Sequence, residues 1–153
     1  MVLCLHRLRN VRRGFAETLQ MNAKLKITEP YDKEQFLAER IYVAPANYHL
    51  IFSAGSSFRL SVDDPVNHSR PSLDVFFESA AEVFGKNCVG VLLSGANWDG
   101  AKGMQAIHDS GGLTIVQDPL DCEVGIMTKA CISMFDPDHI YDADKIINFI
   151  KNL

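Results

Sequence analysis

The sequence predicts an α/β fold: a doubly wound, mostly parallel sheet with helices on both faces and one small antiparallel hairpin. In the second half of the chain, short apolar runs alternate with segments whose apolar residues recur every three or four positions, which is the order strand, helix, strand, helix. Strands joined through helices pair in parallel with right-handed crossovers. The 153 residues are 47% hydrophobic and contain no repeat or linker, so we expect one domain over residues 1–153.

The first half of the chain is expected to begin with a buried strand, because the apolar run Val2–Leu5 starts almost at the first residue. Turn residues separate the later runs, which are rich in β-branched and aromatic side chains. The predicted elements that follow the first strand are a helix at Gly14–Met21 and strands at Lys24–Ile27, Arg40–Ala44, Leu50–Ser53 and Ser57–Val62, the last two forming the hairpin.

A helical apolar period begins at Ser72, whose hydroxyl suits an N-cap, and Gly85 suits the end of that helix. The apolar residues after Ser72 repeat at steps of three and four, as one buried face of a helix requires. The remaining predicted elements are a strand at Val89–Leu93, a helix at Gly100–Asp109, a strand at Leu113–Val116 and helices at Val124–Met134 and Ala143–Asn152.

Composition excludes several classes of partner. A net charge of −4 and a pI near 5.7 argue against nucleic-acid binding. No apolar run approaches the roughly 18 residues that span a bilayer, so we expect a cytoplasmic protein without membrane insertion. We also expect reduced thiols and no metal site, because neither the cysteines nor the remaining histidines show paired ligand spacing: Cys4, Cys88, Cys122, Cys131, His49, His68, His108 and His139.

Two polar residues follow predicted parallel strands. His6 comes directly after the first strand, and Asp99 lies in the loop after Val89–Leu93. Because ligands bind where the carboxyl ends of parallel strands meet, the two side chains can form the His–carboxylate pair that fixes a general base. The simpler interpretation is an ordinary loop histidine and a helix N-cap, which Asp followed by Gly-Ala-Lys also suits.

The segment Gly95–Lys102 is close to a phosphate loop, in which backbone amides surround phosphates and a lysine reaches the outer ones. Its spacing is wrong, because Lys102 is one residue late and Gly103 stands where a hydroxyl should bind magnesium. Asp99 would also place a negative charge within the anion site. We therefore do not expect nucleotide binding.

Several segments together resemble the catalytic domain of the bacterial chemotaxis protein-glutamate methylesterases, the CheB family. The segments are VLCLH at residues 2–6, IYVAPANYHL at 41–50, RPSLDVFFESAA at 70–81, LSGANWDGAKGM at 93–104 and GGLTIVQD at 111–118. The resemblance implies that His6 is the catalytic base and Asp99 its orienting carboxylate. It also implies a two-step acyl transfer on glutamyl methyl esters of chemoreceptor helices, with no cofactor and with oxyanion stabilisation by amides that include the Gly95 loop. Related enzymes can also deamidate receptor glutamines, which the sequence leaves open.

The nucleophilic serine of the family is missing from this sequence. The family places it in a Gly-rich turn one strand–helix unit before the histidine, and no Gly-x-Ser-x-Gly stretch is present. We therefore expect a chain truncated at its amino terminus, without a receiver domain, whose first strand has an unpaired edge through which the chain can associate. The alternative function is a non-catalytic module of the same fold that binds a receptor or another partner.

Two features depart from the family pattern. Gly95-Ala96-Asn97-Trp98 replaces the usual Gly-Met-Gly and variable residue before the aspartate, which alters the wall of the pocket. The loop after His6 is unusually basic. Its arginines are either solvated or placed to dock an acidic receptor helix, since charge at a rim aids encounter and orientation: Arg7, Arg9, Arg12 and Arg13.

Overall fold

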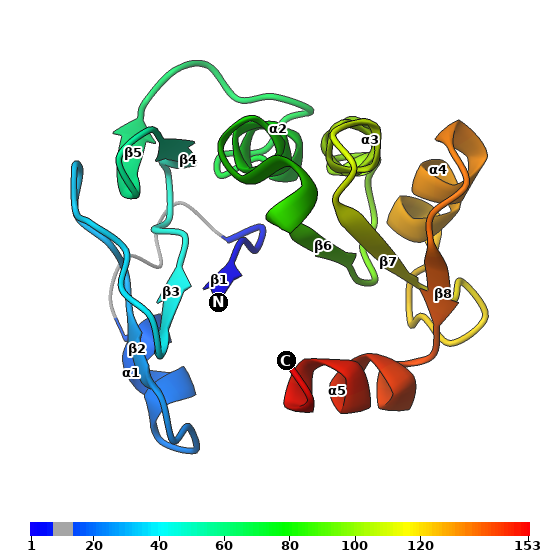
Figure 1. Cartoon of the computed structure of the whole chain (residues 1–153), viewed down its shortest axis with the longest axis horizontal. Coiled ribbons are helices and arrows are strands. Elements are labelled where there is room, and N and C mark those ends of the chain that lie inside the picture. Colours follow the sequence, from blue (N-terminus) through cyan, green and yellow to red (C-terminus); the bar gives the residue numbers. More distant parts are fainter. Residues whose placement is uncertain (8–13) are drawn as a thin grey trace.

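The computed structural model describes residues 1–7 and 14–153 (Figure 1). The strands and helices of the first half are β1 (Val2–Leu3), α1 (Phe15–Gln20), β2 (Lys26–Thr28), β3 (Arg40–Val43), β4 (His49–Ser53) and β5 (Ser57–Ser61). Those of the second half are α2 (Leu73–Phe84), β6 (Val89–Leu92), α3 (Ala101–Asp109), β7 (Leu113–Gln117), α4 (Ile126–Met134), β8 (His139–Tyr141) and α5 (Ala143–Lys151), with a short 3-10 turn at Gly85–Asn87.

Two parallel sheets of three strands carry the fold. One has the order β1-β3-β2, with Val2 opposite Tyr42 in the register of β1 and β3. The other has the order β6-β7-β8, with Val91 opposite Ile115 in β6 and β7. The antiparallel pair β4-β5 is separate. The predicted class, mostly parallel with helices on both faces and a small antiparallel hairpin, is confirmed.

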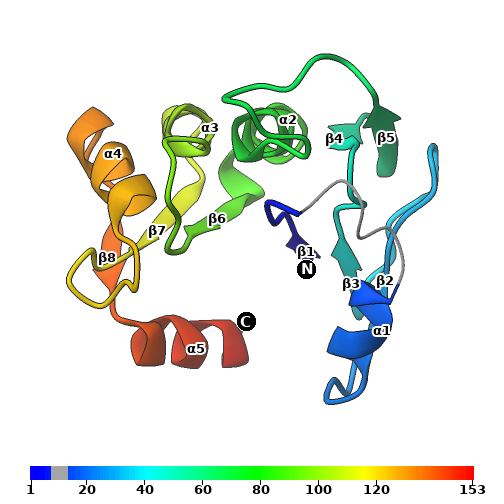
Figure 2. The ribbon, with the colours of Figure 1, turned by 180° about the vertical axis from the view of Figure 1, so that it is seen from behind.

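Helices cover both faces of the second sheet. Figures 1 and 2 show α2 and α3 above β6 and β7, and α5 on the opposite side. The main core lies between α2, α3, the hairpin and the strand faces, and includes the fully buried Leu50, Leu92 and Met104. Strands β1 and β6 are neighbours in both views, so the loops that follow them can lie at the same edge.

Local signals in the sequence account for the ends of α2. Ser72 is its N-cap and accepts a hydrogen bond from the amide of Val75 at 3.4 Å, and Gly85 ends the helix with φ +50°. Strand β8, which the sequence analysis did not predict, is the main difference. It has only three residues and is bordered by Asp138 and Asp142, so it lacks the apolar run that identifies a strand.

Every helix within residues 1–7 and 14–153 is too short or too polar to cross a membrane. The four cysteines lie in the structure as free thiols. Burial raises the pKa of Cys88 to about 11 and that of Cys131 to about 12, the latter with a contribution from the charge of Asp74. These two thiols are therefore protonated, unreactive parts of the core.

Candidate active site

The structure brings His6 and Asp99 together although they are 93 positions apart in the sequence. The two residues lie in the loops that leave β1 and β6, and His6 Nε2 is 2.7 Å from Asp99 Oδ2. Asp99 is completely buried, whereas the His6 side chain is 30% exposed. This is the arrangement of an orienting carboxylate beneath an accessible imidazole.

Within residues 1–7 and 14–153, Asp99 accepts hydrogen bonds from five groups. Its other donors besides His6 are the Ser72 hydroxyl at 2.7 Å, the amides of Leu73 and Asp74 at 2.6 and 3.2 Å, and the Asn67 amide nitrogen at 3.2 Å. Burial raises the pKa of Asp99, but the hydrogen bonds from His6, Ser72, Leu73 and Asn67 outweigh it and the net pKa lies below the ordinary value. The side chain is therefore a carboxylate at neutral pH.

Asp99 and Asp74 cap each other's helices. Asp99 precedes α3 but binds the first amides of α2, those of Leu73 and Asp74. Asp74, in the first turn of α2, accepts from the amides of Gly100 and Gly103 at the start of α3, at 2.8 and 2.9 Å. The simpler sequence interpretation of Asp99 as the N-cap of α3 is therefore wrong, since Gly100 holds that position and Asp74 satisfies the helix amides.

Asn67 joins the two carboxylates. Its amide nitrogen donates to Asp74 Oδ2 at 2.8 Å and to Asp99 Oδ1 at 3.2 Å. Sequence reasoning missed both Asn67 and Asp74. The first lies in a loop without a distinctive pattern, and the second resembles any acid that favours the first turn of a helix. The amides that Asp74 binds belong to the start of α3, and the local sequence of α2 does not show this contact.

The hydrogen bond to Asp99 determines the tautomer of His6. A carboxylate only accepts hydrogen bonds, so Nε2 carries the proton and Nδ1 has the free lone pair. Within the described residues, the only group that hydrogen-bonds to Nδ1 is the amide nitrogen of Asn97, at 3.4 Å. Asn97 also accepts from the amide of Asp99 at 3.2 Å, and its amide nitrogen lies 3.3 Å from the Ser69 hydroxyl. Asn97 thus covers the nitrogen that a general base would use.

Replacing Asn97 by glycine is expected to uncover Nδ1 without changing the tautomer, because Asp99 and not Asn97 places the proton on Nε2. Long-range ¹H–¹⁵N NMR spectra of His6 should show the Nε2–H form in the wild type and in Asn97→Gly. They should show a mixture of tautomers in Asp99→Ala. We expect Asn97→Gly to change the free energy of unfolding by no more than about 0.5 kcal/mol. A switch to the Nδ1–H form in Asn97→Gly would contradict the prediction.

None of the serines in the described residues hydrogen-bonds to His6. Ser72 donates to Asp99, and Ser69 contacts Asn97. Ser56 and Ser57 lie at the β4-β5 turn, and the Ser94 amide donates to the Gln117 side chain at 3.0 Å. The described residues therefore hold an imidazole bonded to a buried carboxylate, but no serine hydroxyl within hydrogen-bond distance of that imidazole.

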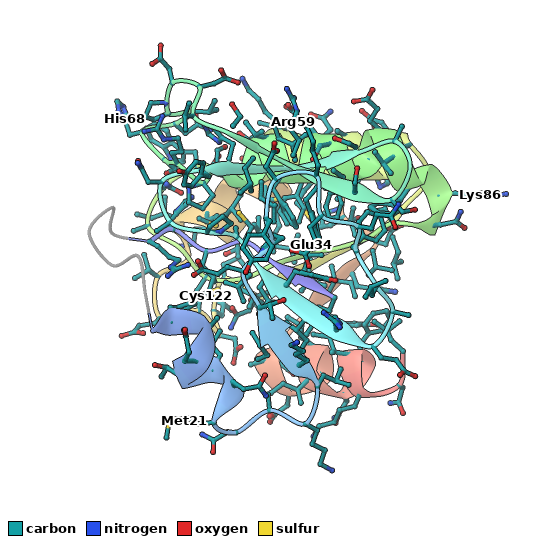
Figure 3. The ribbon with its side chains drawn as sticks, turned by 90° about the vertical axis from the view of Figure 1, so that its left-hand side faces the viewer. Met21, Glu34, Arg59, His68, Lys86 and Cys122 are labelled. Atoms are coloured by element: carbon teal, nitrogen blue, oxygen red, sulfur yellow. The ribbon has the colours of Figure 1, made fainter. Side chains whose placement is uncertain are left out.

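The other histidines have structural or surface positions. His49 is buried, contacts the Asp64 carbonyl through Nε2 at 3.1 Å and accepts from the Ser72 amide at 3.3 Å. His108 lies 3.8 Å from Asp138, His139 stacks on Tyr141, and His68 projects from the rim of the molecule (Figure 3). In the part of the chain that the structure describes, no three His, Cys, Asp or Glu side chains are grouped to hold a metal ion.

The structure contradicts both sequence interpretations of Arg7, as a solvated side chain and as a docking residue. Its side chain is only 4% exposed, pairs with Glu29, donates to the Ala44 carbonyl at 3.2 Å and lies 4.5 Å from the centre of the Phe15 ring. It holds the segment after β1 against β3 and α1, so it is neither solvated nor available to a receptor helix. Arg9, Arg12 and Arg13 lie outside the described residues.

The family model of the CheB methylesterases matches residues 1–150. The chain belongs to the CheB methylesterase family. Its structure is also similar to the Thermotoga maritima CheB methylesterase catalytic domain, with a TM-score of 0.90 and 29% identity over 99% of this chain and 82% of that domain.

CheB relatives differ in how much of their length this chain spans. A Leptospira interrogans relative is 42% identical over 135 residues, which are 88% of this chain and 70% of the relative. A protein-glutamate methylesterase/protein-glutamine glutaminase of Nitrosomonas europaea is 41% identical over 131 residues, which are 84% of this chain but only 37% of that protein. The CheB fold and family therefore cover nearly the whole chain, whereas the relatives contain further sequence.

Proposed function

We propose that this chain carries the base and the orienting carboxylate of a protein-glutamate methylesterase that removes methyl groups from glutamyl side chains of chemoreceptor helices. The observation that supports this most directly is the 2.7 Å hydrogen bond between His6 and the buried Asp99. It leaves Nδ1 of an accessible imidazole as the basic atom. The names of the CheB relatives support the ester of a protein glutamate as the substrate.

In the proposed reaction, His6 Nδ1 removes the proton of a serine hydroxyl as the serine oxygen attacks the γ-carbonyl carbon of the ester. The protonated ring then gives this proton to the departing methoxide, so methanol leaves and an acyl-enzyme remains. Water attacks the acyl-enzyme with the same base, which releases the glutamate side chain and restores the serine. Asp99 keeps the Nε2 proton in place and balances the charge of the imidazolium in both steps.

The serine would come from residues outside this sequence, on a strand next to β1 and β6. Among the described strands, each of these two has one unpaired edge, and both views show them as neighbours without a strand between them (Figures 1 and 2). Both are members of parallel sheets, so an added strand would lead its following turn toward His6. We propose that the working enzyme acts on receptors in the cytoplasm.

Methanol release from a methylated receptor tests this function, using the chain joined to the serine-bearing strand and turn of a CheB relative. We expect His6→Ala to lower kcat by about a thousandfold or more. The matched control is His139→Ala, at the far edge of the β6-β7-β8 sheet, which should keep activity within about twofold. Equal activity in both variants would show that His6 is not the base. A joined protein that binds receptor without releasing methanol would favour the non-catalytic module.

A further inference from the structure

A groove between α3 and α4 opens beside the candidate active site. Figures 1 and 2 show the two helices side by side. On α4, Met127, Thr128 and Cys131 face the core, and the opposite side of the helix lines a hollow of about 670 Å³. The α4 residues that line it follow helical spacing, which gives one continuous stripe: Ile126, Lys129, Ala130, Ser133 and Met134.

The groove borders the hydrogen-bond network around Asp99. Trp98, directly before Asp99, forms part of its wall and is 72% exposed. Asn67 and Asp74 also line the groove, and both belong to the hydrogen-bond network of Asp99. A segment lying in the groove would therefore pass beside residues that hold Asp99, the hydrogen-bond partner of the imidazole that the proposed reaction uses.

The exposed charges of the groove are positive. Lys102 and Lys129 line it, and neither takes part in an ion pair within the described part of the chain. The one acid in the lining, Asp74, is buried and bound to amides. Glu78 on α2 is close enough to Lys102 for the charges to interact, but is not paired with it. Exposed Trp98, Ile126 and Met134 supply apolar surface in the same lining.

We propose that the α3–α4 groove, lined by Trp98, Lys102, Ile126, Lys129 and Met134, docks an amphipathic helix of the protein substrate whose acidic residues flank an apolar stripe. The proposal rests on the function proposed above, in which the substrate helix carries glutamates. Apolar side chains of the helix pack on Trp98 and Met134, as in other helix-in-groove complexes, and its carboxylates pair with the two lysines. Docking places a glutamyl ester of the same helix near His6.

Trp98 provides a direct signal for docking, because it is the only tryptophan of the chain. The probe is a synthetic helical peptide of about 20 residues, with an apolar stripe at i, i+3, i+4 and i+7 flanked by glutamates and without an ester. We expect it to shift the Trp98 emission to shorter wavelength and to protect the indole from acrylamide, saturably and more strongly at low salt. A peptide with glutamines in place of the glutamates should bind about tenfold more weakly.

Charge reversal tests the role of the lysines. Lys102→Glu/Lys129→Glu should raise the Kd of the glutamate peptide about tenfold, and should bind a lysine-flanked version of the peptide instead. The matched control, Lys86→Glu/Lys151→Glu, changes the net charge equally at exposed positions outside the groove and should keep the Kd within about twofold. Because gained binding to the lysine peptide requires a folded protein, misfolding cannot imitate the expected result.

Three results would overturn the proposal. The first is a Trp98 emission that shows no saturable change when the glutamate peptide is added. The second is an equal rise in the Kd of that peptide in both double variants. The third is a Trp98 emission that shifts with protein concentration alone, which would mean that a second copy covers the groove. Because the probe carries no ester, its binding is independent of catalysis. Binding of the probe, together with no methanol release from methylated receptor by the joined protein, would refute only the proposed function. Methanol release with an unchanged KM in Lys102→Glu/Lys129→Glu would refute only the groove.

Discussion

Replacing Asp99 by alanine is expected to lower the free energy of unfolding by about 3 kcal/mol or more, because several buried donors lose a charged acceptor at once. The Ser72 hydroxyl and the Leu73 amide are the closest of these donors besides His6, and both are buried away from water. Urea denaturation followed by circular dichroism measures the change. The exposed Asp136, whose carboxylate is not hydrogen-bonded in the described residues, offers a matched control, and Asp136→Ala should stay within about 0.5 kcal/mol of the wild type.

The difference in free energy of unfolding between the wild type and Asp99→Ala is expected to depend on pH. The pKa of Asp99 in the folded chain lies below its ordinary value of 3.8, so the unfolded chain takes up the proton first as the pH falls. The contribution of Asp99 is therefore fully present above the unfolded value and is lost as the pH falls through the folded pKa. The stability difference between wild type and Asp99→Ala should be full near neutral pH and should narrow below about pH 4. A difference that widens in acid would contradict this account.

Gly103→Ala is expected to lower the free energy of unfolding by about 2–3 kcal/mol, although alanine in the middle of a helix normally stabilises by about 1 kcal/mol. A Cβ at this position would lie 2.6 Å from the Cβ of Phe77 and 2.9 Å from the carbonyl oxygen of Asp74, so α3 and α2 would have to separate. Separation would also stretch the hydrogen bond from the Gly103 amide to Asp74.

The control for this prediction lies in the same helix. Gln105 is partly exposed and its side chain makes no hydrogen bond in the described residues, so Gln105→Ala should change stability by no more than about 0.5 kcal/mol. Thermal and urea denaturation of the two variants would separate crowding at the helix crossing from helix propensity. A stabilising Gly103→Ala would mean that the two helices can move apart without cost.

Topology made a pairing of His6 with Asp99 possible, and the resemblance to the CheB family favoured it over a loop histidine and a helix N-cap. Parallel strands place the loops at their carboxyl ends on one edge, and the sequence identified both strands and both polar residues. The role of Asp74 could not be predicted in this way. A helix-forming segment with an acid in its first turn looks the same whether the acid faces water or the amides of a second helix.

Arg7 shows a second limit of sequence pattern. A cluster of arginines beside a site suggests a solvated or docking surface, because charge is usually exposed. Burial of Arg7 depends on Glu29 and Phe15, which lie in separate elements and come together only through the β1-β3-β2 sheet. Similarly, β8 gains its strand character from pairing with β7 and not from its own three residues.

The exchange of caps between Asp74 and Asp99 restricts where negative charge can be stabilised during the proposed reaction. The first amides of α2 and α3 would otherwise attract an anion, but both sets already bind carboxylates. The Gly95 amide, to which the family resemblance assigned part of the oxyanion site, donates to the Val124 carbonyl. In this loop only the amides of residues 96–98 make no hydrogen bond within the described part of the chain. In the proposed reaction, the amides of this loop that are left for an oxyanion are therefore those of the segment in which this chain departs from the Gly-Met-Gly pattern of its family.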